Sequence, residues 1–103
     1  MVLKYSIEID KDAIIENIDR IINQIFKLLP LREEHGDWQA PLQNLIMEVG
    51  GMNRLLRDHT ILFSLLCKME ALTILTEEDD YIAFRKLIFE CLSLLKQLKS
   101  CLD

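Results

Sequence analysis

Apolar residues in the last quarter of the chain recur at alternating steps of three and four positions. The members of this series are Tyr81, Phe84, Ile88, Cys91, Leu95, Leu98 and Leu102. Such spacing places the side chains on one face of a long α-helix, and a face of this length has to be buried against other helices. The series therefore predicts an all-α fold.

Three earlier stretches of the sequence show the same helical period. Together the four helices are expected at residues 10–29, 41–57, 60–75 and 77–101. We expect Pro30 to end the first helix, because proline lacks an N–H and clashes with the preceding turn. Four amphipathic helices with short connections predict one domain, residues 1–103, folded as a four-helix up-down bundle.

The second helix contains two consecutive glycines, Gly50 and Gly51, but its apolar series keeps its phase on both sides of them. The helix is therefore expected to continue through the pair. Because each glycine costs about 1 kcal/mol relative to alanine, we expect a compensating close helix crossing on that side, or else a kink.

The first nine residues have a different pattern. Leu3, Tyr5, Ile7 and Ile9 alternate with polar residues, which is typical of an extended strand. With no second strand candidate in the sequence, this N-terminal arm has unpaired backbone groups. It can pair with its copy in a second subunit, add to the sheet of a partner, or pack on the bundle. The first of these favours a homodimer.

Charge and cysteine content restrict the classes of function. The formal net charge is −5, and the basic residues are scattered, so binding to nucleic acid or to an anionic membrane is not expected. Cys67, Cys91 and Cys101 lie among leucines and are expected to be small buried hydrophobic residues. No ligand spacing joins them to the histidines, so neither a metal nor another cofactor is predicted. No secretory or membrane-spanning segment is evident, which favours a cytoplasmic protein.

The loop at residues 30–40 holds the only tryptophan, Trp38. Two interpretations remain open for it. The side chain can fold back and fill the end of the bundle, or it can act as an anchor for a partner protein, because tryptophan is enriched at interface hot spots.

The segment Arg54-Leu55-Leu56-Arg57-Asp58-His59 contains an arginine and a histidine separated by four residues. This spacing resembles the R-x4-H motif of the HEPN ribonucleases, which are small helical proteins. The resemblance implies catalytic roles for Arg54 and His59 in RNA cleavage at a dimer cleft. The motif departs from the family pattern at Leu55, where a polar residue is usual, and at Thr60 and Ile61 after the histidine. A helix C-terminus followed by a turn histidine is the alternative interpretation.

Several apolar residues lie off the expected core faces, namely Phe63, Ile74, Ile82 and Phe89. A helix that is apolar on more than one side is either central or contacts a partner. We therefore expect a small cytoplasmic, non-enzymatic interaction or regulatory module that acts as a homodimer. It would contact a further protein through these residues and Trp38. A HEPN-like ribonuclease and a bundle that binds an apolar small molecule are the alternatives.

Overall fold

The computed structural model describes residues 11–56 and 59–102. Within these ranges the chain forms four α-helices, one 3-10 turn and no strand, which confirms the all-α class. The elements are α1 (Lys11–Glu33), α2 (Gln39–Leu55), α3 (Thr60–Leu72), η1 (Glu78–Asp80) and α4 (Tyr81–Leu102). The predicted N-terminal arm lies outside the described residues.

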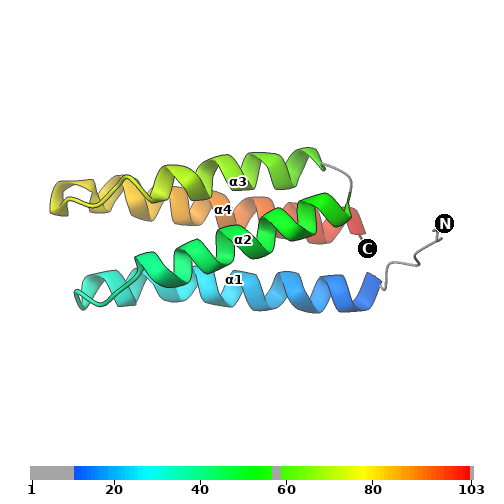
Figure 1. Ribbon diagram of the computed structural model, residues 1–103, viewed down its shortest axis with the longest axis horizontal. Coiled ribbons are helices and arrows are strands. Elements are labelled where there is room, and N and C mark those ends of the chain that lie inside the picture. The colour runs from blue at the N-terminus through cyan, green and yellow to red at the C-terminus, as the bar shows by residue number, and fades with distance from the viewer. Residues whose placement is uncertain (1–10, 57–58, 103) are drawn as a thin grey trace.

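The four α-helices lie side by side along the long axis of the molecule (Figure 1). Helix α1 contacts α2 and α4, and α3 contacts the same two helices. The start of α1, the end of α2, the start of α3 and the end of α4 meet at one end of the molecule. The opposite end holds the connection between α1 and α2 and the connection between α3 and α4.

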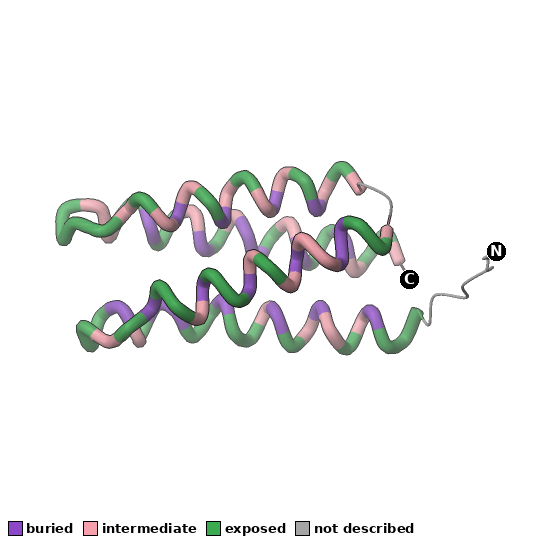
Figure 2. The backbone as a smooth tube through the Cα atoms, viewed as in Figure 1, coloured by how far each residue is buried: buried purple, intermediate pink, exposed green. Residues whose placement is uncertain are grey.

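The core follows the predicted apolar series. In α4, the inner five members of the series are buried, whereas the outer two, Tyr81 and Leu102, are half-buried. Figure 2 shows buried positions recurring along one side of every helix. In α1 the buried series is Ile14, Ile18, Ile21, Ile25 and Leu28, as its spacing predicts.

Helix α1 does not end at Pro30 but continues to Glu33, so this prediction was wrong. Proline removes only its own bond to the carbonyl four residues earlier, that of Phe26. Phe26 and Pro30 both lie on the exposed side of α1, where water can hydrogen-bond the freed carbonyl. Beyond Pro30 the helical ladder resumes, since the Glu34 N–H donates to the Pro30 carbonyl at 3.0 Å.

The true end of α1 is a Schellman motif. The His35 N–H donates to the Arg32 carbonyl at 3.0 Å, and the Gly36 N–H donates to the Leu31 carbonyl at 2.9 Å. His35 has a φ of 60°, so a histidine occupies the left-handed position that usually holds glycine.

Helix α2 continues through both glycines, as predicted, but no described helix crosses closely there. A Cβ on Gly50 would meet no described atom within 4 Å, and one on Gly51 would meet only Arg54 Nη2, at 3.9 Å. The expected close crossing is therefore wrong. The helix begins two residues before the predicted Pro41, because Asp37 Oδ1 accepts hydrogen bonds from the Gln39 and Ala40 N–H groups.

The connection between α3 and α4 is longer than predicted. Helix α3 ends at Leu72 rather than near residue 75, and η1 precedes α4. A capping box joins Glu77 and Asp80, whose Oδ2 accepts a hydrogen bond from the Glu77 N–H at 3.1 Å. Among the described residues, three ion pairs link neighbouring helices at the surface: Arg20–Glu48, Lys68–Glu90 and Asp19–Lys99. Each exposed pair of this kind contributes little to stability.

Candidate interaction surface

Seven large apolar side chains are exposed among the described residues. Four belong to the predicted partner-binding set: Phe63, Ile74, Ile82 and Phe89, with exposed fractions of 60%, 75%, 82% and 44%. The other three are Phe26, Met47 and Leu55. Exposed apolar side chains become informative where they gather on one face, because contiguous apolar patches mark interaction sites.

Phe26 of α1 and Phe89 of α4 meet on one such face. Their ring centroids lie 6.3 Å apart at an interplanar angle of 86°, which is the edge-to-face arrangement that aromatic pairs prefer. Phe26 directly follows the core residue Ile25 in the sequence. The structure buries Ile25 completely and leaves Phe26 about half exposed, so the α1–α4 seam has an aromatic ridge at the surface.

A hollow lies beside this ridge on the outer side of α4. We call it the α4 hollow; it has a volume of about 260 Å³ and is lined by Tyr81, Ile82, Arg85, Lys86 and Phe89. The guanidinium carbon of Arg85 lies 5.4 Å from the centroid of the Phe89 ring, within the range of a cation–π contact. Neither Arg85 nor Lys86 forms an ion pair with any residue in the described part of the chain.

The charge of α4 is opposite to that of the rest of the protein. Helix α4 contains four basic residues, Arg85, Lys86, Lys96 and Lys99, and one acidic residue, Glu90, for a net charge of +3. The whole chain has a net charge of −5, so the remaining residues sum to −8. The apolar face at α4 is therefore edged by cations on an otherwise acidic protein.

Trp38 folds back and fills the end of the bundle that holds the connection between α1 and α2. This is the first of the two interpretations of the residue. Its side chain is 8% exposed and meets Phe84 of α4 edge to face, with centroids 4.9 Å apart. An anchor for a partner protein has to be exposed, so the buried ring of Trp38 does not fit that role in this conformation.

Arg32 is a buried charged residue that packs against Trp38, and nothing in the sequence indicates this role. It is 9% exposed, and its guanidinium carbon lies 4.8 Å from the centroid of Trp38 and 4.4 Å from that of Phe84. Arg32 donates hydrogen bonds to the carbonyls of Leu75 and Glu77, the second at 2.7 Å. It thereby joins the end of α1 to the connection between α3 and α4.

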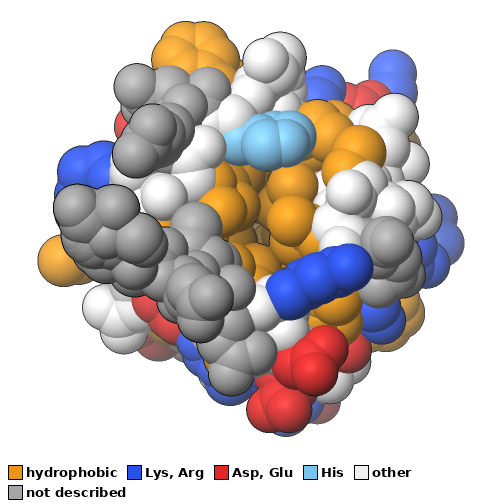
Figure 3. Space-filling view, turned by 90° about the vertical axis from the view of Figure 1, so that its right-hand side faces the viewer, with side chains coloured by type: hydrophobic (Ala, Val, Ile, Leu, Met, Phe, Trp, Pro, Cys, Tyr) orange, Lys and Arg blue, Asp and Glu red, His pale blue; other side chains and the backbone are white. Residues whose placement is uncertain are grey.

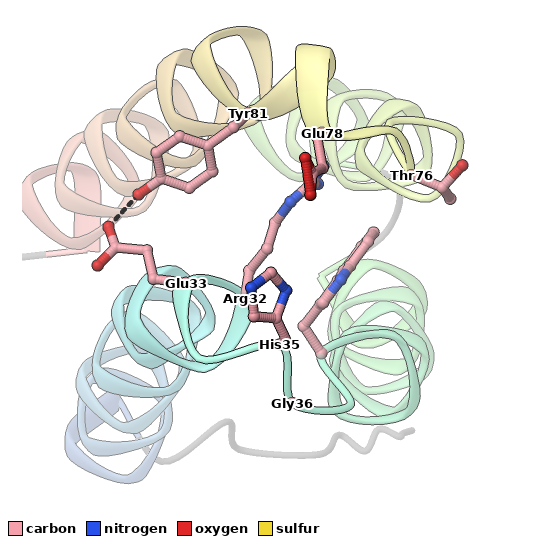
Figure 4. A pocket seen from close by; sticks show the side chains of 8 residues that line it. Arg32, Glu33, His35, Gly36, Thr76, Glu78 and Tyr81 are labelled. Atoms are coloured by element: carbon pink, nitrogen blue, oxygen red, sulfur yellow. Dashed lines mark hydrogen bonds between the residues drawn. The ribbon is translucent and has the colours of Figure 1, made fainter.

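A pocket of about 380 Å³ opens beside Arg32 (Figure 4). Arg32 and Glu33 line it from the end of α1, and His35 from the turn that follows. On the other side, Glu78 belongs to η1 and Tyr81 to the start of α4. The Tyr81 hydroxyl donates a hydrogen bond to Glu33, which raises the pKa of Tyr81. The guanidinium of Arg32 is already engaged by two backbone carbonyls and by the rings of Trp38 and Phe84, so in this pocket it has a structural role.

The two residues of the R-x4-H motif lie at the opposite end of the molecule. His59 caps α3, and its Nδ1 accepts a hydrogen bond from the Ile61 N–H at 3.2 Å. Arg54 is exposed in the last turn of α2. The alternative interpretation, a helix C-terminus followed by a turn histidine, describes this geometry. Their implied roles in RNA cleavage stay predictions.

Figure 3 views this same end and shows hydrophobic side chains at its centre, surrounded by polar and charged ones. Asn53, in the last turns of α2, is 8% exposed, and its Oδ1 has no hydrogen-bond partner among the described residues. A buried acceptor without a partner is costly in a folded protein.

The cysteines differ from one another in exposure. Cys91 is fully buried, and burial raises the pKa of its thiol to about 12. Cys67 and Cys101 are exposed, so the prediction that all three are buried was wrong for these two. In the described part of the chain, no group of three His, Cys, Asp or Glu side chains could hold a metal ion.

Compared with known proteins, the chain matches no family model, no curated protein and no solved structure. None of the described helices is both long enough and apolar enough to cross a bilayer.

Proposed function

We propose that this protein is a small, cytoplasmic, non-enzymatic interaction or regulatory module, built as an up-down four-helix bundle that acts as a homodimer. The observation that carries the proposal is the set of exposed aromatic and aliphatic side chains on α3 and on the α1–α4 seam. Burying apolar surface is the main driving force of protein association, and these side chains are available for it.

The surface of α3 supports self-association. Phe63 and Cys67 lie one turn apart on its exposed side, and Ile74 lies in the turn that follows the helix. These three residues form an exposed apolar stripe, and between Phe63 and Ile74 only Glu70 adds an exposed charge to it. Two copies of such a stripe can pack against each other around a twofold axis, because an isologous interface uses the same patch on both subunits. In the proposed homodimer the N-terminal arm, with Leu3, Tyr5, Ile7 and Ile9, would pair with its copy in the second subunit.

Light scattering tests the homodimer directly. The parent protein is expected at about twice its chain mass of 12.1 kDa. Phe63→Ser together with Ile74→Ser should return the mass to that of one chain, whereas Met47→Ser, on the exposed side of α2, should leave it unchanged. Deleting residues 1–9 measures the contribution of the arm. A parent protein that is monomeric at every concentration would overturn the homodimer.

A second candidate function, binding of an apolar small molecule, is supported by Asn53. Its Oδ1, unpaired within the described part of the chain, lies in α2 near the end of the molecule that Figure 3 shows, where apolar side chains form the centre. A ligand with an apolar body and one hydrogen-bond donor would satisfy both features. Native mass spectrometry of the purified protein should then show a bound molecule, and a spectrum of the bare chain alone counts against this candidate.

A further inference from the structure

We infer that the α4 hollow and the adjacent Phe26 form a docking site for an acidic amphipathic helix of a partner protein. This inference rests on the proposed function and adds to it the chemistry of the partner. It is carried by three properties of the site: its shape, its free cations and the charge of its surroundings.

The shape suits an apolar anchor. Ile82 and Phe89 are separated by two helical turns of α4, or about 10.5 Å, and the hollow of about 260 Å³ lies between them. The Phe26–Phe89 pair continues the apolar surface onto α1. Large side chains at positions i, i+3, i+4 and i+7 of a partner helix can therefore pack along this surface.

The cations of the site form no ion pair among the described residues, although Lys86 adds to the effect of Lys68 in lowering the pKa of Glu90. Arg85 and Lys86 line the hollow, are exposed and have no ion-pair partner among the described residues. Two nearby carboxylates are already engaged: Glu33 accepts a hydrogen bond from Tyr81, and Glu90 pairs with Lys68 at 2.8 Å. A partner with acidic residues beside its apolar ones would supply the missing counter-charges.

The surroundings exclude two other occupants. In a symmetric contact centred on the α4 hollow, Arg85 and Lys86 of one copy would face the same two cations of the other copy, so a second copy fits poorly. A flat anionic membrane would also press the acidic residues 77–80, which immediately precede Tyr81 and Ile82, against its head groups. A single helix that crosses α4 over Phe89 and Phe26 instead contacts the end of the hollow that lies away from residues 77–80.

Two synthetic peptides of about 14 residues, a common helix length, test the inference. Both carry leucine at i, i+3, i+4 and i+7; one has glutamate at the remaining positions and the other has lysine. In nuclear magnetic resonance titrations of the full chain, we expect the acidic peptide to bind at least ~10-fold more tightly. The shifted amides should cluster around residues 82–89 and Phe26.

Two variants sharpen the experiment. Arg85→Glu together with Lys86→Glu should reverse the preference between the peptides, whereas Met47→Ser on α2 should change neither affinity. Equal affinities, shifts confined to α2 or α3, or no binding of either peptide would overturn the inference. Tighter binding to vesicles that contain anionic lipid than to the acidic peptide would also overturn it and assign the surface to membranes. Whether the protein forms a homodimer is tested separately, by the mass of the parent protein in light scattering.

Discussion

The rings of Phe26 and Phe89 meet edge to face across the α1–α4 seam, with centroids 6.3 Å apart, although both side chains are roughly half exposed. A pair in this position adds little to the core because much of its area stays in water. It does fix the local shape of the seam, since each ring restricts the other. The surface that we propose as a docking site is therefore formed before a partner arrives.

A double-mutant cycle measures this contact. We expect Phe26→Ala and Phe89→Ala to show a coupling energy of about 0.5–1 kcal/mol, in the lower part of the range for aromatic pairs because both rings are about half exposed. Urea unfolding of the parent, the two single variants and the double variant provides the four free energies. Fully additive single effects would mean that the rings do not stabilise each other in solution.

Arg32 should contribute far more to stability than its charge suggests. Replacing it with methionine leaves two loop carbonyls without their donor and removes the cation from its aromatic neighbours Trp38 and Phe84. We expect the free energy of unfolding, measured in urea, to fall by about 3 kcal/mol. Lys27→Met, at an exposed position of the same helix, is the matched control and should change stability by less than about 0.5 kcal/mol. Similar losses in the two variants would contradict the anchoring role of Arg32.

Gly50 and Gly36 should respond in opposite ways to substitution by alanine. At Gly50 the new Cβ meets no described atom within 4 Å inside a regular helix, so Gly50→Ala should stabilise the protein by about 1 kcal/mol. At Gly36 the Cβ would lie 2.6 Å from Leu31 Cδ1, so Gly36→Ala should destabilise it by about 1 kcal/mol. Thermal unfolding of both variants compares the two signs directly, and a loss of stability at Gly50 would contradict the open surroundings seen there.

His35 has the left-handed backbone conformation that glycine adopts without strain. We expect His35→Gly to raise the free energy of unfolding by about 1 kcal/mol, because the helix C-terminus keeps both hydrogen bonds of its Schellman motif. His35→Ala retains the strain and provides the matched control. Equal stabilities of the two variants would show that the conformation of residue 35 relaxes in solution.

The buried thiol of Cys91 makes stability depend on alkaline pH. Its pKa is raised by burial from an ordinary value of 9.0 to about 12 in the folded state. Below pH 9 the thiol is neutral in both states, so its contribution is fully present. Above pH 9 it ionises only in the unfolded chain, and stability falls by about 1.4 kcal/mol per pH unit until the folded pKa is reached.

Denaturation at a series of pH values tests this dependence, and Cys91→Ala should show a shallower decline between about pH 9 and 11. Thiol titration gives an independent check. Cys67 and Cys101 should react in the folded protein, whereas Cys91 should react only after denaturation. Rapid reaction of all three thiols in the native state would contradict the burial of Cys91.

Much of the fold could be predicted because core burial follows a simple period. The helical spacing of α4 identified five of its six buried residues, from Phe84 to Leu98, without knowledge of their neighbours, and missed Leu92, which lies off the series. Pro30 was misjudged because the rule for proline concerns one lost hydrogen bond, while the outcome depends on whether water can replace it. The glycines of α2 were misjudged because the sequence does not show which side of a helix lacks a neighbour.

The candidate site was predictable only in part, for a related reason. Ile82 and Phe89 were identified because they lie off the core series. Phe26 was missed because it directly follows the core residue Ile25, and consecutive side chains of α1 are only about 100° apart around the helix axis. The role of Arg32 could not be predicted because its hydrogen-bond acceptors are backbone carbonyls in a distant turn. Every residue has such a carbonyl, so the sequence does not mark the ones that Arg32 contacts.

The two hydrogen bonds from Arg32 to the carbonyls of Leu75 and Glu77 span more than forty positions of the chain. The connection between α3 and α4 is consequently not a free surface loop, and it cannot detach unless the last turn of α1 also releases it. We therefore expect these segments to unfold together. Amide protons in the connection should therefore exchange with solvent about as slowly as those at the end of α1.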